Sequence, residues 1–164
     1  MRGAELPRII AALKGPIDTF VKDARVRVSL LINRSGQVLA QHGFTSSYEV
    51  MNVASLAAAA HASSRALADL TQSGDWTHLH HAGQRIELFL ATLKTPVEPL
   101  ILVTIFDAES SLGLVQLFFA QLAQRVSGLP ELQVARVSAD QVSFERDLEA
   151  GVERAFTSER RNEA

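Results

Sequence analysis

The chain has 164 residues, 47% of them hydrophobic and 21% charged, which is enough for one domain with a buried core. Its formal net charge of −2 gives no basic field, so general binding to nucleic acid is not expected. The chain has no cysteine, which excludes disulfides and thiolate chemistry and favours a cytoplasmic location. The longest strongly apolar run, residues 100–106, is too short for membrane insertion, and the N-terminus does not resemble a signal peptide.

The first predicted element is a helix, because apolar residues recur at spacings of three and four over residues 6–21. A Gly-Pro pair lies in its middle, yet the apolar register continues across it. We therefore expect a kinked helix or two short collinear helices. Residues 26–33 are β-branched and partly alternating, which predicts a strand. Residues 37–42 are predicted to return after a tight turn as the second strand of a hairpin.

The next predicted element is an unusual helix, ASLAAAAHASSRALADL, residues 54–70. Ser46 and Glu49 fit a capping box at its start, and Gly74 lies near its expected end. On a helical wheel, one side carries leucines at its ends and small residues in its middle. We expect this side to face a sheet; it comprises Leu56, Ala60, Ser63, Leu67 and Leu70.

The opposite side of this helix is also sparse. It carries three alanines where an exposed helix would usually carry lysine and glutamate; its members are Ala54, Ala58, Ala62, Arg65 and Asp69, with His61 at the flank. Alanine is a good helix former, and that alone is one explanation. The alternative is that a second backbone approaches this side closely.

Three more strands are predicted at residues 76–82, 85–93 and 99–107, followed by a helix at residues 110–126. Hairpin connections between strands imply an antiparallel sheet with helices on its faces, an α+β layered domain over residues 1–128. Residues 129–164 are predicted to form a C-terminal extension with a short extended piece at 132–137, an amphipathic helix and a polar tail. One side of that helix carries Phe144, Leu148, Val152 and Phe156.

The histidines form the most conspicuous candidate metal ligands. His78 and His80 fall on one face of a predicted strand, about 7 Å apart, and His81 falls on the other. Two imidazoles at that spacing bind zinc only if further ligands converge. We favour the alternative, polar residues exposed to solvent or at a dimer seam, and expect no metal.

No catalytic residue or cofactor is predicted. The chain has no phosphate-binding G-x-x-x-x-G-K-[ST] loop and no G-x-S-x-G nucleophile elbow. Ser110 and Ser111 stand where a helix N-cap is expected, and Asp107 ends a strand, where it would support the turn or the helix start. The chain is therefore not expected to be an enzyme.

Four stretches resemble the roadblock family, and most of all its bacterial MglB-type members. They are VSLLINRSGQVLA, then VASLAAAAHASSRALADL followed by Trp76, then ELFLATL, and finally ILVTIFDAESSLGLVQL. Together they span roughly residues 16–126. The resemblance implies a profilin-like fold with a five-stranded antiparallel sheet in the order α-β-β-α-β-β-β-α. It also implies homodimers joined through an edge strand and the 54–70 helix.

The resemblance further implies a platform for a Ras-like small GTPase. MglB-type proteins bind a GTPase of the MglA kind and stimulate its GTP hydrolysis, in settings such as cell polarity and motility; a non-catalytic adaptor is the alternative. The GTPase interface is then expected at Ala58, Ala62, Arg65, Ala66 and Asp69, with a further contact at Phe144, Leu148, Val152 and Phe156. The family does not use an arginine finger, so we expect Arg65 to pair with Asp69.

Overall fold

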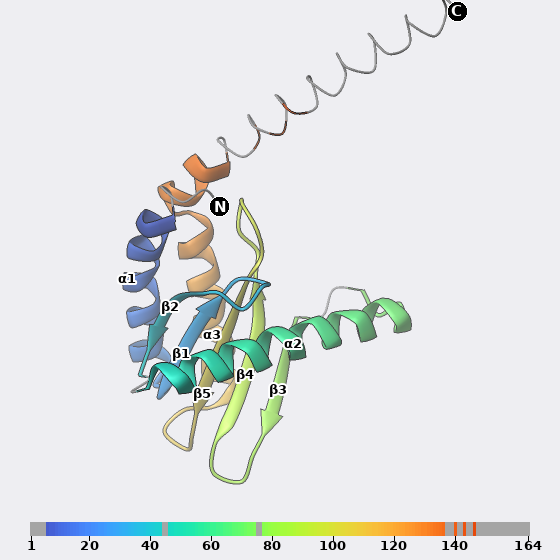
Figure 1. Cartoon of the computed structure of the whole chain (residues 1–164). Coiled ribbons are helices and arrows are strands. Elements are labelled where there is room, and N and C mark those ends of the chain that lie inside the picture. The colour runs from blue at the N-terminus through green and yellow to red at the C-terminus, as the bar shows by residue number, and fades with distance from the viewer. Residues whose placement is uncertain are drawn as a thin grey trace, which may run out of the picture.

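The computed structural model describes residues 6–43, 46–74 and 77–136, together with residues 140, 143 and 146. Within these ranges the helices and strands follow the predicted order (Figure 1). They are α1 (Leu6–Ala24), β1 (Val28–Ile32), β2 (Val38–His42), α2 (Ser47–Thr71), β3 (His78–Ala82), β4 (Glu87–Leu93), β5 (Leu100–Phe106) and α3 (Leu112–Ser127).

The five strands form one antiparallel sheet in the order β2-β1-β5-β4-β3. Each β1, β4 and β5 residue sends its side chain to the face opposite to that of its chain neighbour. Leu31 therefore faces one side with its cross-strand partner Leu102, while Leu30 faces the other with Val103. This alternation gives the sheet two apolar faces, and the α+β prediction is confirmed.

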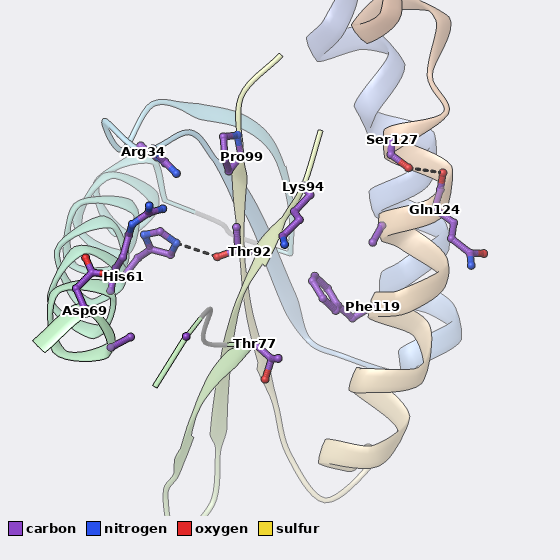
Figure 2. Close-up of a pocket in the computed structure, with 14 residues that line it drawn as sticks. Arg34, His61, Asp69, Thr77, Thr92, Lys94, Pro99, Phe119, Gln124 and Ser127 are labelled. Atoms are coloured by element: carbon purple, nitrogen blue, oxygen red, sulfur yellow. Dashed lines mark hydrogen bonds between the residues drawn. The ribbon is translucent and has the colours of Figure 1, made fainter. Parts of the chain in front are cut away.

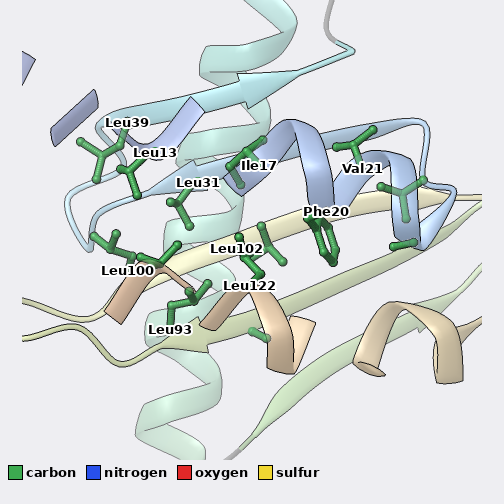
Figure 3. Close-up of a cluster of buried hydrophobic side chains, with 14 of the residues drawn as sticks. Leu13, Ile17, Phe20, Val21, Leu31, Leu39, Leu93, Leu100, Leu102 and Leu122 are labelled. Carbon is green, nitrogen blue, oxygen red and sulfur yellow. The ribbon is translucent and has the colours of Figure 1, made fainter. Parts of the chain in front are cut away.

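Helices α1 and α3 cover one face of the sheet together, and α2 crosses the other (Figure 1). The α1/α3 face holds the larger core, which Figure 3 shows with side chains from both helices and the sheet interdigitating. In α1 the buried residues recur every three or four positions; they are Ile9, Leu13, Ile17, Phe20, Val21 and Ala24. Pro16 lies inside α1, which is one helix rather than two.

Residues 130–136 are helical, so the extended piece predicted at residues 132–137 is wrong over residues 132–136. Pro130 suits the first position of a helix, where its missing N–H would have no partner. The backbone N–H groups of Leu132 and Gln133 both donate to the carbonyl of Leu129. Leu132 and Ala135, three positions apart, are both buried in the larger core. A helix brings these two side chains to the same face, which a strand would not.

The ends of α2 lie close to their predicted places. Ser46 is the N-cap residue, with extended backbone angles, but its side chain makes no capping hydrogen bond. The helix ends at Thr71, and Gln72 adopts a positive φ of 52° while its N–H donates to the carbonyl of Asp69. Across the described ranges, no helix combines the length and apolarity needed to cross a membrane.

Candidate partner surface and adjoining pocket

Helix α2 faces the sheet with small side chains. Ala54, Ala57, His61 and Ala68 are its buried residues. The sheet face beneath is already filled by larger apolar side chains, namely Leu30, Ile32, Leu90, Ile101 and Val103. Alanines on the helix leave room for those side chains, so the helix can lie close to the sheet.

The predicted orientation of α2 is wrong. Leu56, Leu67 and Leu70 do not face the sheet: they are 71%, 61% and 82% exposed. Ala60 is only partly buried, and Ser63 is exposed. The large side chains of the sheet occupy the space that leucines on α2 would have needed, and the small side chains of the helix face them instead.

The exposed apolar residues of α2 form one continuous side, here called the outer face. It comprises Met51, Leu56, Ala59, Ala62, Ala66, Leu67 and Leu70. Four of these are large side chains, and burying each against a partner would be worth roughly 1.5–3 kcal/mol. Nothing in the described part of the monomer covers them. A contiguous apolar surface of this kind indicates a site of protein association.

The five residues predicted for the GTPase interface do not share one environment. Ala62 and Ala66 lie on the outer face and are exposed. Ala58 is half-buried and packs against the smaller core. Arg65 and Asp69 are exposed and line a pocket beside the helix. The predicted Arg65–Asp69 ion pair is absent from the part of the chain that the structure describes.

The pocket has a volume of about 670 Å³ and opens between α2, the end of β4 and α3 (Figure 2). Strand β3 pairs with β4 from His78, opposite Ala91, to Ala82, opposite Glu87. Thr92 and Lys94 follow on β4 and beyond it, where the described part of β3 no longer runs alongside, and both line the pocket. Phe119 contributes an apolar wall from α3.

Arg34 reaches this pocket from the β1–β2 turn. The side-chain oxygen of Asn33 accepts hydrogen bonds from the backbone N–H groups of Ser35 and Gln37, at 3.1 and 2.9 Å. Gly36 has a φ of 83°, which glycine adopts without strain. These features hold the turn in a defined shape, so the position from which Arg34 extends is set by local sequence.

His61 is the buried polar residue of the site. Its Nε2 lies 2.9 Å from the hydroxyl of Thr92, across the gap between α2 and β4 (Figure 2). Burial lowers the pKa of His61 below its ordinary value of 6.5, and the positive charges of Arg34 and Arg65 lower it further. The imidazole is therefore neutral at neutral pH. The prediction that His61 lies at the flank of the outward side is wrong, because the residue is buried and contacts the sheet through Thr92.

The histidines of β3 differ in what they contact. His78 stacks on Phe89 with ring centres 5.3 Å apart, and His80 Nε2 lies 2.6 Å from a carboxylate oxygen of Glu87. His81 is exposed. Within the described ranges, no group of three or more histidine, aspartate or glutamate side chains is placed to hold a metal ion.

The polar residues before α3 have structural roles. Ser111 is the N-cap of α3 and accepts a hydrogen bond from the N–H of Leu114, as predicted. Ser110 donates its hydroxyl to the carbonyl of Ala24, 2.5 Å away. Asp107 pairs with Arg27 and accepts from the N–H of Glu109, which stabilises the turn. The predicted C-terminal contact residues, Phe144, Leu148, Val152 and Phe156, lie outside the described residues.

The chain was compared with known proteins. The family model described as the Roadblock/LC7 domain matches residues 17–106. MglB from Myxococcus xanthus is 28% identical, with a TM-score of 0.63 over 77% of this chain and 90% of that one. The gliding protein MglB from Thermus thermophilus is 26% identical, with a TM-score of 0.60 over 77% and 91% of the two chains.

A further solved structure, described as MglB with a tetrameric arrangement, is 26% identical, with a TM-score of 0.62 over 82% of this chain and 95% of that one. A search of curated proteins finds no match. The family model spans more than half of the chain, and it includes both hairpin strands, α2 and strands β3 to β5. The chain therefore belongs to the Roadblock/LC7 family.

Proposed function

We propose that this protein is a homodimeric regulator that binds a Ras-like small GTPase of the MglA type and stimulates its GTP hydrolysis. The observation that carries the proposal is the outer face of α2, an apolar surface that has no cover in the described monomer. Similarity to MglB structures supports the identity of the partner. This function requires a cytoplasmic location, which the lack of cysteine favours.

The outer face divides into two flanks that suit two different partners. Leu56, Leu67 and Leu70 lie within one narrow sector of the helix and supply large side chains for packing. We call it the leucine sector and assign it, with an edge strand of the sheet, to a second copy of the chain. Ala62 and Ala66 lie in the neighbouring sector, here called the alanine sector, where small side chains allow a close approach. We assign the alanine sector to the GTPase.

Stimulation of hydrolysis would act through the catalytic residues of the GTPase itself. Arg65 and Asp69 border the alanine sector, but Arg65 also lines the pocket beside His61. In that position we expect its charge to contact the edge of the interface and not the phosphate groups of the nucleotide bound to the GTPase. We expect Arg65→Ala to leave stimulated hydrolysis largely intact. A loss of several hundred-fold with binding preserved, the size expected for an arginine finger, would contradict this mechanism.

The decisive test combines GTP turnover with one substitution on the outer face. Ala62→Arg places a long charged side chain in the alanine sector and is expected to abolish binding to the GTPase and any stimulation. Ala120→Arg is the matched control, because Ala120 is an exposed alanine on α3, on the other side of the sheet. Both variants should keep the oligomeric mass of the wild type. Unchanged GTPase binding by Ala62→Arg would refute the assignment of this sector to the GTPase. If the wild-type protein binds the GTPase without stimulating GTP hydrolysis, it is an adaptor.

The C-terminal extension is a second candidate contact with the GTPase. Phe144, Leu148, Val152 and Phe156 recur at helical spacing, which suits an amphipathic helix docked on a partner. Deletion of residues 138–164 is expected to weaken GTPase binding without changing the oligomeric mass. A deletion that leaves the affinity unchanged would restrict the contact to α2.

A further inference from the structure

The pocket beside α2 concentrates positive charge in a chain that is acidic overall. Among the described residues that line it, Arg34, Arg65 and Lys94 are cationic and Asp69 is acidic. The formal net charge of the whole chain is −2. The described lining of the pocket is therefore more positively charged than the chain as a whole, which favours the binding of anions.

The electrostatics of His61 agree with this arrangement: burial is the main cause of its lowered pKa, and the arginines add to it. Both Arg34 and Arg65 contribute to lowering its pKa, although one extends from the β1–β2 turn and the other from α2. The pocket is therefore lined by two guanidinium groups from separate elements. Arginine forks match the oxygen geometry of a phosphate and can bind it through two parallel hydrogen bonds.

The rest of the pocket suits the organic part of a ligand. Phe119 and Pro99 are partly buried and offer apolar surface, and Thr92 supplies a hydroxyl already oriented by His61 (Figure 2). The volume of about 670 Å³ falls within the range of roughly 300–1,000 Å³ for small-molecule sites. An inorganic anion alone would leave most of this space and all of its apolar wall unused.

We propose that this pocket binds a small organic phosphate ester, with the phosphate held between Arg34 and Arg65 and the organic group against Phe119 and Pro99. The site adjoins the alanine sector of α2 but requires neither a GTPase nor a second copy of the chain. It is thus a property of the chain itself, separate from the proposed function.

The proposal can be tested by calorimetric titration of the full chain with phenyl phosphate, inorganic phosphate and benzoate. We expect phenyl phosphate to bind about tenfold or more tightly than either other probe, because only it offers both the phosphate and the apolar group. Its affinity should also fall as the salt concentration rises. Equal affinity for inorganic phosphate, equal affinity for benzoate, or no binding of phenyl phosphate at millimolar concentration would each overturn the proposal.

Substitution of the arginines locates the site. The double variant Arg34→Gln/Arg65→Gln should weaken phenyl phosphate binding by about tenfold or more, since it removes two charge-assisted contacts. Both side chains are exposed, so the thermal unfolding midpoint should change little. Arg85→Gln is the matched control, because Arg85 is an exposed arginine in the β3–β4 connection and does not line the pocket. Equal weakening by the control would overturn the assignment.

Discussion

The two faces of the sheet are covered in different ways. On one face, α1 and α3 bury large side chains, among them Leu13, Phe20 and Leu122, and the monomer completes this core by itself. On the other face, α2 presents alanines to the sheet and leucines to solvent. One face of the sheet thus carries a core that is complete within one chain. The other face carries a helix whose outer side is available to a partner.

The difference lies in where the large residues of each helix point. In α1 most of the large apolar residues face the sheet and are buried in the core, while Ile10 is 37% exposed. In α2 the sheet already supplies the large residues, so the leucines of the helix add nothing to the fold of the monomer. Large apolar side chains exposed together on one side of a helix indicate a contact outside the monomer. The following substitutions test this contrast, beginning with the largest expected loss of stability.

Truncation in the α1/α3 core should have the largest effect. Phe20 is almost fully buried, and Phe20→Ala is expected to lower the free energy of unfolding by about 3–5 kcal/mol through lost burial and the cavity left behind. Urea denaturation measures the change. Leu117→Ala on α3 is the control, because Leu117 is 55% exposed and its loss should cost far less. Equal costs would mean that this face is not the closed core described.

Enlarging the inner side of α2 should have an intermediate effect. Ala57 is buried between α2 and the sheet, so Ala57→Leu is expected to destabilise the fold by about 1–3 kcal/mol through overpacking. Ala59 is exposed on the outer side of the same helix, and Ala59→Leu is its matched control. Denaturation at low protein concentration compares the free energies of unfolding of the two variants. A greater loss for the outer variant would reverse the assigned orientation of α2.

Lowering the pH should destabilise α2 through His61. Because its folded pKa lies below 6.5, the unfolded chain takes up a proton first as the pH falls, and stability is lost from about pH 6.5 down to the folded pKa. The groups that face it are the cations Arg34 and Arg65, its hydrogen-bond partner Thr92, and the nearby charges of Lys94 and Asp69 in the same pocket.

His61→Gln removes this titration and keeps a polar side chain near Thr92. Denaturation of both proteins above and below pH 6.5 should show a smaller pH-dependent loss of stability in the variant. A loss of the same size in both proteins would show that protonation of His61 does not contribute.

Local patterns predicted most of the fold. The apolar spacing in α1 and α3 and the short apolar runs in β1, β4 and β5 each depend on neighbours in the sequence, so the order of elements and the antiparallel sheet could be anticipated. The extended piece expected at residues 132–137 is wrong over residues 132–136, which are helical. Burial of Leu132 and Ala135 in the same core depends on contacts that are distant in the sequence.

The site was harder to predict than the fold. Both sides of α2 are rich in small residues, so a helical wheel could not tell which side the sheet would accept; that depended on Leu30, Ile101 and their neighbours. The pocket draws Arg34, Arg65 and Lys94 from three separate parts of the chain. Arg65 could be singled out from the sequence because it lies beside the alanines, but no spacing in the sequence relates it to Arg34 or Lys94.

The leucine sector should matter least for the fold of the monomer and most for assembly. Leu56 and Leu67 are exposed, so the double variant Leu56→Glu/Leu67→Glu should alter the intrinsic stability of one chain by only about 0.5 kcal/mol per site. The wild-type dimer should gain stability by mass action, so its unfolding midpoint should rise with protein concentration. The variant should lose that dependence and elute with the mass of a monomer. A wild-type midpoint that does not change with concentration would mean that the outer face is covered by another partner alone.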